Sequence, residues 1–173
     1  DIPKDVQTAL YEYEPEGKFE KNPPFAAKEI RIKEAAKTIN KAKTPFIYFG
    51  GGLLSSDAKE EMLTLAEKID APIGCSLMGL SAIPTDSTER FLGMQGMHGH
   101  LASSMAQKQA DLIIGVGVRF SDRATGNTAK FAKGTKIIQL DPDMAEINKN
   151  VNVDLGIVAD VLDSFERILA GVK

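Results

Sequence analysis

The chain has 173 residues, of which 43% are hydrophobic and 26% are charged, a composition typical of a globular domain. The formal net charge of -3 gives no electrostatic reason to expect a nucleic acid or an anionic membrane as partner. A single cysteine excludes a disulfide framework, and we see neither a signal-peptide pattern nor an apolar run that could span a bilayer, so we expect a cytoplasmic protein.

The first 25 residues differ from the rest of the chain. The opening DIPKDVQ has no initial Met, and we expect it to be the end of a preceding domain. Residues 8–25 are rich in Pro, Glu and Lys and have no hydrophobic periodicity, which is typical of a linker crossing a surface. We therefore expect residues 1–25 to be an interdomain linker and residues 26–173 to form the domain itself.

From residue 26 onward, helical and strand patterns alternate. Near-helical spacing of apolar residues predicts helices over 26–42, 56–69 (with Ser56 as a polar cap), 99–109 and 161–172, and a short one near 144–149. Uniformly apolar runs predict buried strands over 45–50, 71–77, 110–117, 135–141 and 155–160. This order predicts an α/β fold, with a doubly wound, Rossmann-like parallel sheet of about five or six strands and helices on both faces.

Unusual residues follow each predicted strand. In chain order they are Gly50, Gly51 and Gly52; Ser76, Leu77 and Met78; Gly117, Arg119 and Arg123; Asp141 and Pro142; and Asp160 and Val161. The carboxyl ends of parallel strands share one edge, and open α/β sheets bind ligands at that edge. We therefore expect these segments to converge on one ligand site.

The residue types at this edge suit a dinucleotide. Glycines let a ligand approach the backbone, and N–H groups at helix starts hold phosphates. Arg119 and Arg123 can neutralise a pyrophosphate, and Asp141 can accept hydrogen bonds from ribose hydroxyls. The side chains that could line an aromatic ring are Leu77, Met78 and Met97.

Two glycine patterns fall short of the NAD fingerprint. GGGLLS has Ser55 where the third glycine belongs, and Asp70 precedes the second strand instead of ending it. GVGVRF has Phe120 in the third place. A free-standing protein that binds NAD or an adenylate remains an alternative, but these mismatches argue against it.

The residues at this edge also have purely structural interpretations. The glycines at 50–52 fit a tight strand-to-helix turn, and Arg119 and Arg123 fit a surface salt-bridge cluster with Asp122. Asp141 fits an N-cap for the short helix near 144–149.

The residues of the stretch GMQGMHGHLA, 93–102, also fit either ligand binding or a purely structural role. His98 has no Ser or Cys nucleophile nearby, so lining a ligand or starting a helix is favoured over catalysis. His98 and His100 lack partners at metal-ligand spacing, so we expect no protein-bound metal. Met94 and Met97 fit ordinary packing as well as a ligand wall, and Cys75 is expected in the core.

Four stretches, SLMGLSAIP, FLGMQGMHG, GVGVRFSDRATGN and LDPDMAEINKN, carry a family resemblance. In order and spacing they resemble the central domain of acetohydroxyacid synthase (acetolactate synthase) large subunits, which are thiamine-diphosphate enzymes of branched-chain amino-acid biosynthesis. The stretch R-F-x-D-R-x-T-G resembles the corresponding stretch of family members that bind FAD. DIPKDVQ resembles the end of their first domain, so the resemblance spans nearly the whole chain.

The resemblance implies a parent enzyme, a transferase, that decarboxylates pyruvate and joins the hydroxyethyl unit to a second pyruvate or to 2-oxobutyrate. Flanking thiamine-binding domains would carry thiamine diphosphate and Mg²⁺, so the isolated domain would be inactive and would hold no catalytic residue. FAD would lie along the sheet rim of this domain without net redox. The parent would be a homodimer or tetramer and could pair with a regulatory small subunit.

The resemblance also implies which residues surround FAD. They are Gly50, Gly51, Gly52, Ser76, Leu77, Met78, Gly96, Met97, His98, Gly117, Arg119, Arg123, Asp141, Pro142, Glu146, Asp160 and Val161. In the intact enzyme Met97 and His98 would also face the substrate channel.

The chain departs from the family near this ligand at Ser76, where Thr is common and the hydroxyl is kept, and at three further positions. Ser121 stands where Asp is common, Pro142 where Ile is common, and Ala159 where Gly is usual. These changes remove a carboxylate and an N–H group and add a methyl group near the adenine. A central domain that serves only in assembly and binds no flavin is therefore a second alternative, although Arg119 and Arg123 argue against it.

Overall fold

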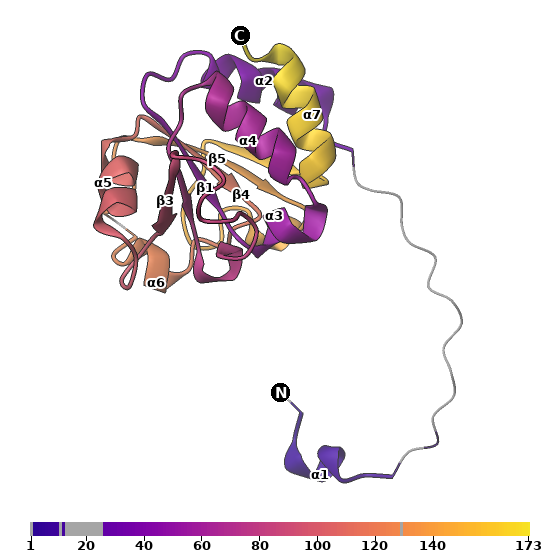
Figure 1. The fold of residues 1–173 in the computed structure, drawn as a ribbon. Helices are drawn as coiled ribbons and strands as arrows, with labels where there is room; N and C mark the ends of the chain where they lie inside the picture. Colours follow the sequence, from indigo (N-terminus) through magenta and orange to yellow (C-terminus); the bar gives the residue numbers. More distant parts are fainter. Residues whose placement is uncertain (1, 11, 13–25, 129) are drawn as a thin grey trace.

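One parallel sheet organises the domain. The structure, a computed structural model, describes residues 2–10, 12, 26–128 and 130–173. The strands are β1 Pro45–Phe49, β2 Ile73–Cys75, β3 Phe91–Met94, β4 Leu112–Val116, β5 Lys136–Asp141 and β6 Leu155–Val158. Their order in the sheet is β3-β2-β1-β4-β5-β6, and every neighbouring pair is parallel (Figure 1). This confirms the predicted doubly wound sheet, whose strand order reverses between β1 and β4.

Helices cover both faces of this sheet (Figure 1). The described residues form the helices α1 Lys4–Gln7, α2 Glu29–Ile39, α3 Gly51–Ser56, α4 Lys59–Lys68, α5 Leu101–Gln109, α6 Asp122–Thr125 and α7 Val161–Gly171, with 3-10 turns η1 Leu77–Gly79 and η2 Met144–Glu146. Helix α1 buries no residue and is not one of the helices that cover the sheet. The larger core cluster packs α2, α3, α4 and α7 on one face. The smaller cluster packs residues of α5, α6 and the loop after β4 on the other face.

Side-chain alternation along β1 explains why its sequence is apolar throughout. Ile47 and Phe49 belong to the larger cluster, whereas Phe46 and Tyr48 belong to the smaller one. All of these side chains are buried because both faces of the sheet are covered. The strand therefore shows no polar alternation in the sequence.

Two local predictions were wrong. The stretch Phe91–Met94 was not predicted as a strand, yet it forms the edge strand β3, half-buried and with Gly93 at a φ of +82°. The helix predicted over 56–69 begins only at Lys59, and Gly51–Ser56 form a separate helix, α3, that was not predicted; Asp57 ends α3 by adopting a left-handed conformation. Ser56 therefore does not cap α4; its hydroxyl donates to the Leu53 carbonyl instead.

The predicted linker lies mostly outside the described residues, so the division at residue 26 stays a prediction. Within residues 2–10 the structure shows the short helix α1, which the sequence did not predict. Every helix in the described ranges is too short or too polar to cross a lipid bilayer.

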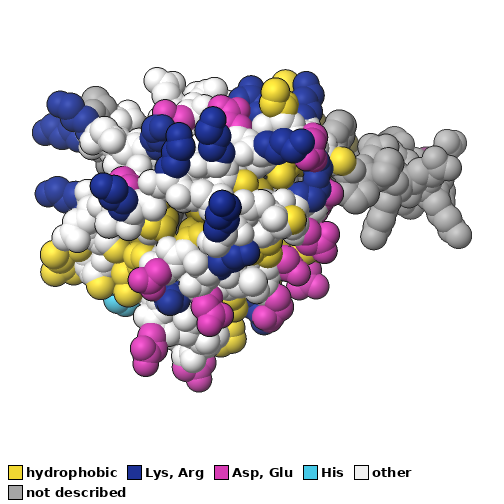
Figure 2. Space-filling model, turned by 90° about the horizontal axis from the view of Figure 1, so that it is seen from above, with side chains coloured by type: hydrophobic (Ala, Val, Ile, Leu, Met, Phe, Trp, Pro, Cys, Tyr) yellow, Lys and Arg dark blue, Asp and Glu magenta, His cyan; other side chains and the backbone are white. Residues whose placement is uncertain are grey.

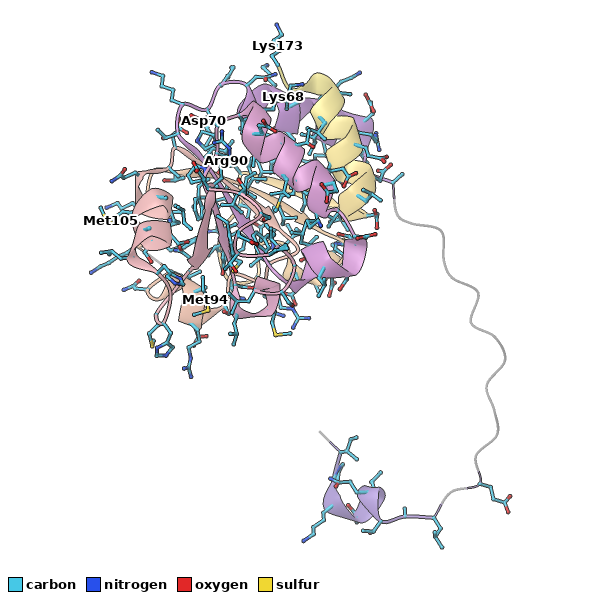
Figure 3. The ribbon with its side chains drawn as sticks, viewed as in Figure 1. Lys68, Asp70, Arg90, Met94, Met105 and Lys173 are labelled. Atoms are coloured by element: carbon cyan, nitrogen blue, oxygen red, sulfur yellow. The ribbon has the colours of Figure 1, made fainter. Side chains whose placement is uncertain are left out.

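The side of the domain seen from above carries many cationic side chains (Figure 2). Lys37, Lys68 and Lys108 occupy the last turns of α2, α4 and α5, where a cation stabilises the negative end of the helix dipole. Asp70 and Arg90 also pair here (Figure 3). Asp70 precedes β2, so it lies at the amino ends of the strands and is not a ribose-binding acid at their carboxyl ends.

Candidate cofactor site

A cavity of about 820 Å³ lies at the carboxyl edge of the sheet. It brings together fourteen of the seventeen residues expected around the ligand. They are Gly50, Gly51, Gly52, Ser76, Leu77, Met78, Gly117, Arg119, Arg123, Asp141, Pro142, Glu146, Asp160 and Val161.

Three expected residues, Gly96, Met97 and His98, do not line this cavity. Their loop lies beside it, because the Met97 N–H donates to the Arg123 carbonyl at 2.9 Å. Met97 is 68% exposed and so is not a core residue, and α5 begins after His100, not His98. The stretch 96–98 could extend the cavity wall only for a ligand that reaches past Arg123.

Eight lining residues were absent from the sequence-based set. They are Tyr48, Leu54, Ser55, Ser56, Val118, Phe120, Ser121 and Asp143. Some had a readable signal: Tyr48 stands two positions before the glycine turn, and Asp143 is a second carboxylate just after β5. Leu54, Ser55 and Ser56 were missed because α3, the helix that carries them, was not predicted.

The glycines at 50–52 do two different things. A Cβ on Gly52 would lie 2.5 Å from the Gly117 Cα, and one on Gly50 would lie 2.4 Å from the Gly117 carbonyl oxygen. Gly117 itself has a φ of +51°. Gly50 and Gly52 are therefore required by backbone packing against the loop after β4. A Cβ on Gly51 would meet Met78 at an ordinary 3.4 Å, so packing does not require this glycine, and it lines the cavity.

Phe120 anchors the loop after β4 in the smaller core cluster. Its ring is buried, lies over Gly115 and contacts the Tyr48 ring at a centroid distance of 5.6 Å. Its φ of +48° is rare for a bulky residue and costs roughly 1–3 kcal/mol, which the packing of the ring offsets. With Phe120 anchored, Arg119 and Arg123 are left 78% and 74% exposed at the mouth of the cavity.

The loop after β5 brings carboxylates into the cavity. Asp141 is 7% exposed, and one of its oxygens, Oδ1, accepts from the Asp143 N–H at 2.9 Å. Burial raises the pKa of Asp141, and the nearby charge of Glu146 raises it further. Glu146 Oε1 accepts from Lys149 Nζ at 2.8 Å and lies 3.7 Å from Arg119 Nε.

The structural interpretations of these residues can now be checked. Asp143, not Asp141, caps η2, by accepting from the Ala145 N–H. Asp122 pairs with Arg123 at 3.9 Å on the surface, whereas Arg119 pairs with Glu146. Asp160 caps α7 through the Asp163 N–H. Cys75 is buried in the core, as predicted.

Two contacts fix Glu146 in place. Gln139 Nε2 donates to the Glu146 carbonyl at 3.3 Å and to the Val118 carbonyl at 3.1 Å. The next residue, Ile147, lies against Gly156 of β6, where a Cβ would come within 2.6 Å of it. The carboxylate is therefore held by a rigid backbone.

Three buried polar side-chain atoms among the described residues have no hydrogen-bond partner, and they belong to β1, β5 and η2. They are Tyr48 Oη, Gln139 Oε1 and Glu146 Oε2. Tyr48 and Glu146 line the cavity. A buried polar atom without a partner costs about 1–3 kcal/mol, so these are the least well satisfied polar side chains in the described part of the chain.

The strand order arranges these groups in sequence along the edge. Leu77 and Met78 follow β2, the glycine turn and Arg119 follow the central strands β1 and β4, and Asp141 follows β5. With strands about 4.8 Å apart, the distance from β2 to β6 is about 19 Å. The edge thus runs from apolar, through glycine and cation, to acidic, and suits a long ligand. The described residues contain no group of three His, Cys, Asp or Glu that could hold a metal.

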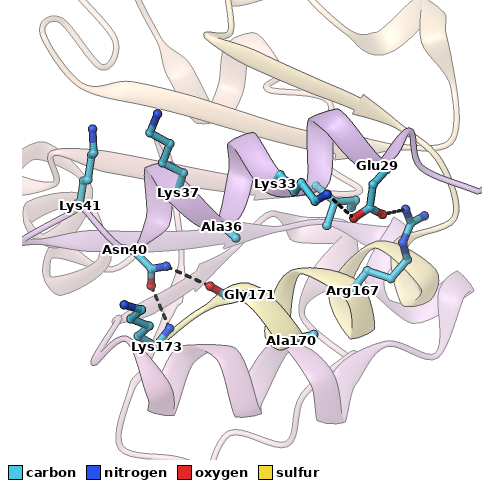
Figure 4. Close-up of a pocket in the computed structure, with 11 residues that line it drawn as sticks. Glu29, Lys33, Ala36, Lys37, Asn40, Lys41, Arg167, Ala170, Gly171 and Lys173 are labelled. Atoms are coloured by element: carbon cyan, nitrogen blue, oxygen red, sulfur yellow. Dashed lines mark hydrogen bonds and ion pairs between the residues drawn. The ribbon is translucent and has the colours of Figure 1, made fainter.

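A second hollow, about 640 Å³, lies between α2 and α7 (Figure 4). Arg167 bonds to Glu29 at 2.7 Å and to Asp163 at 3.2 Å, and Asn40 bonds to the Gly171 carbonyl and the Lys173 N–H. These polar groups satisfy one another across the two helices. The hollow is therefore a helix–helix seam and not a comparable candidate site.

Comparisons with known proteins identify the family to which the chain belongs. Acetolactate synthase large subunits of Haemophilus influenzae and Escherichia coli (isozyme 1) are 37% and 41% identical over 98% and 100% of this chain. A probable large subunit of Methanocaldococcus jannaschii is 40% identical over 99% of it. The chain spans 30% of the length of each of these relatives.

A solved structure of a putative thiamin diphosphate-dependent enzyme from Mycobacterium smegmatis shares the fold. It has a TM-score of 0.73 and 24% identity, over 90% of this chain and 30% of that one. Residues 32–168 match the model of the thiamine pyrophosphate enzyme central domain. The chain belongs to this family of thiamine pyrophosphate enzyme central domains.

Proposed function

We propose that this chain is the central domain of an acetolactate synthase large subunit and that its rim cavity binds FAD. The observation that carries the proposal is the order of groups along the sheet edge: apolar at β2, glycine and arginine at β1 and β4, and acidic at β5. FAD has the same order of parts, from an aromatic ring through a pyrophosphate to a ribose and adenine.

The residues present fit the flavin nucleotide. Leu77 and Met78 are exposed and would cover the ring, and Gly51 leaves room for the pyrophosphate. Arg119 and Arg123 would neutralise it, and Asp141, which lines the cavity, would accept a hydrogen bond from the nucleoside. When bound, FAD would hold these loops together, since no net redox is needed to form acetolactate.

For the parent enzyme we propose the condensation of pyruvate with pyruvate or 2-oxobutyrate. Thiamine diphosphate and Mg²⁺ would be held by flanking domains, which correspond to the other 70% of the relatives' length. This chain alone would then bind FAD without turning over pyruvate. A homodimeric or tetrameric parent with a regulatory small subunit is consistent with relatives named large subunits.

The test is a titration of the 173-residue chain with FAD, followed by flavin fluorescence, with NAD as the control ligand. We expect saturable binding of FAD, and a loss of affinity of about tenfold or more in Arg119→Ala. Arg31→Ala is the matched control, because Arg31 is an exposed arginine on α2 whose partner is Glu34. Unsaturable FAD fluorescence, or an Arg119→Ala affinity equal to that of the wild type, would contradict the flavin site.

A central domain without flavin is the competing function. The departures at Ser121 and Pro142 favour it, because both residues line the cavity. In that case FAD would fail to bind while the chain folds with a cooperative unfolding transition, so the titration separates the two functions.

A further inference from the structure

A third hollow, of about 520 Å³, lies between the second half of α5 and the turn that leads into β5. We propose that this basic hollow binds a small organic phosphate, through Lys108, Lys130 and Lys133 and through the hydrogen-bond donors beside them. The basic hollow shares no lining residue with the rim cavity, so a phosphate can bind here whether or not the rim holds FAD.

The lining of the basic hollow contains three lysines and no carboxylate. All three lysines are exposed, and none of them forms an ion pair or a side-chain hydrogen bond with the part of the chain that the structure describes. Lysines elsewhere on the domain do have acidic partners, as Lys33 has in Glu29 and Lys149 in Glu146. Cations that converge without a counter-charge repel one another, so an anion that enters the basic hollow relieves this repulsion.

The carboxylates next to the strands that adjoin this turn are engaged elsewhere. Asp111, just before β4, accepts from the Lys43 and Thr44 N–H groups at 2.7 and 3.0 Å. Asp154, just before β6, accepts from the Ile137 N–H at 2.8 Å. Neither residue lines the basic hollow, so its walls do not compensate the charge of the lysines.

Two neutral side chains of α5 add donors to the same wall. Gln107 Oε1 accepts from Gln95 Nε2 at 3.3 Å, which leaves the Gln107 amide hydrogens for another acceptor. The Ser104 hydroxyl also has no partner among the described residues. Phosphate oxygens accept hydrogen bonds, and lysine binds phosphate as a point charge, so this combination of donors and cations suits a phosphate group.

The turn before β5 adds an apolar wall and a defined backbone. Ala132 and Gly134, on either side of Lys133, both have a positive φ, of +50° and +83°. The Phe131 side chain is half-buried, and its ring contacts the Phe120 ring at a centroid distance of 5.9 Å. Because Phe131 and Ala132 line the basic hollow beside the lysines, a ligand with a carbon skeleton gains contacts that free phosphate cannot make.

The experiment titrates the isotope-labelled 173-residue chain with phenyl phosphate and with inorganic phosphate, at constant ionic strength, and follows the amide NMR shifts. We expect saturable shifts in residues 104–108 and 130–135, and phenyl phosphate should bind about threefold or more tightly than inorganic phosphate. Lys130→Gln and Lys133→Gln should each weaken phenyl phosphate about fivefold or more. Lys28→Gln removes the same charge from an exposed lysine outside the basic hollow, so its affinity should stay within about twofold of the wild type.

The outcomes separate a defined site from general attraction and from the rim cavity. Shifts confined to residues 50–52 and 117–123, or shifts at 130–135 that vanish in Arg119→Ala, would assign the phosphate to the rim and overturn the basic hollow. Equal weakening by Lys28→Gln and Lys133→Gln would indicate attraction to the whole surface and overturn it too. Equal affinities for the two phosphates would overturn the organic ligand. Removing one of several like charges should not destabilise the free domain, so a lower unfolding free energy in Lys133→Gln would make this lysine structural and contradict the proposal.

Discussion

The cavity at the sheet edge and the hollow between α2 and α7 both contain ion pairs, but they differ in whether a buried polar atom is left without a partner. In the seam between α2 and α7, Arg167 bonds to Glu29, Asp163 and the Ala27 carbonyl. At the sheet edge, Glu146 has two cationic neighbours and still keeps a buried oxygen without a partner. Polar groups that satisfy one another hold helices together, whereas a buried polar atom without a partner lowers the stability of the domain.

The largest expected effect comes from the glycine turn, where we expect Gly52 to be required for packing and Gly51 for ligand binding. Gly52→Ala places a methyl group 2.5 Å from the Gly117 Cα, where backbone cannot give way, and should cost about 3 kcal/mol of unfolding free energy. Gly51→Ala meets only Met78, at 3.4 Å, and should change that free energy by less than about 0.5 kcal/mol while weakening FAD binding. Urea unfolding and flavin titration of both variants measure this. Equal destabilisation by the two alanines would contradict the division of roles.

A smaller effect is expected from the seam. Arg167→Ala removes bonds to Glu29, Asp163 and the Ala27 carbonyl and should lower the unfolding free energy by less than Gly52→Ala does. Its FAD affinity should equal that of the wild type, in contrast to Arg119→Ala. A stable Arg167→Ala variant with weakened FAD binding would show that the two hollows are not independent.

The smallest effects are opposite in sign and depend on pH. Burial raises the pKa of Asp141 above its ordinary 3.8, so its charge opposes folding at neutral pH, and Asp141→Asn should stabilise the domain. That gain should vanish as the pH falls through the raised pKa to below 3.8. The hydrogen bond from Arg167 lowers the pKa of Glu29, so Glu29→Gln should destabilise the domain above pH 4.5. That loss should disappear as the pH falls through the lowered pKa.

Thermal unfolding of both variants across the acidic and neutral range measures these signs. If Asp141→Asn and Glu29→Gln both destabilise the domain at neutral pH, the Asp141 carboxylate is as well stabilised by its neighbours as the Glu29 carboxylate.

The sequence predicted the sheet because its strands are buried on both faces. Runs such as Phe46–Phe49 are apolar throughout, and their spacing between helices defines the fold class. The edge strand β3 was missed because its half-buried residues include Gly93. The break between α3 and α4 was missed because it depends on one left-handed residue, Asp57.

Most of the lining residues of the candidate site were predicted because they directly follow a strand. The hydrogen bonds that these residues make were not predicted. Asp141 follows β5 in the sequence, yet only the folded loop shows that Asp143 uses one of its oxygens. The anchoring of Glu146 by Gln139 joins residues whose relation depends on the turn between them. The residues 96–98 were placed by resemblance, and whether they touch a ligand depends on its length.

The single cysteine offers a way to watch the sheet open. Cys75 ends β2, directly before cavity residue Ser76, and burial raises the pKa of its thiol to about 11. A thiol reagent can reach it only when β2 separates from its neighbours, so the labelling rate reports how often the central sheet exposes this strand. Because Cys75 lies at the strand end beside the cavity, a ligand that holds the loops together would lower its labelling rate.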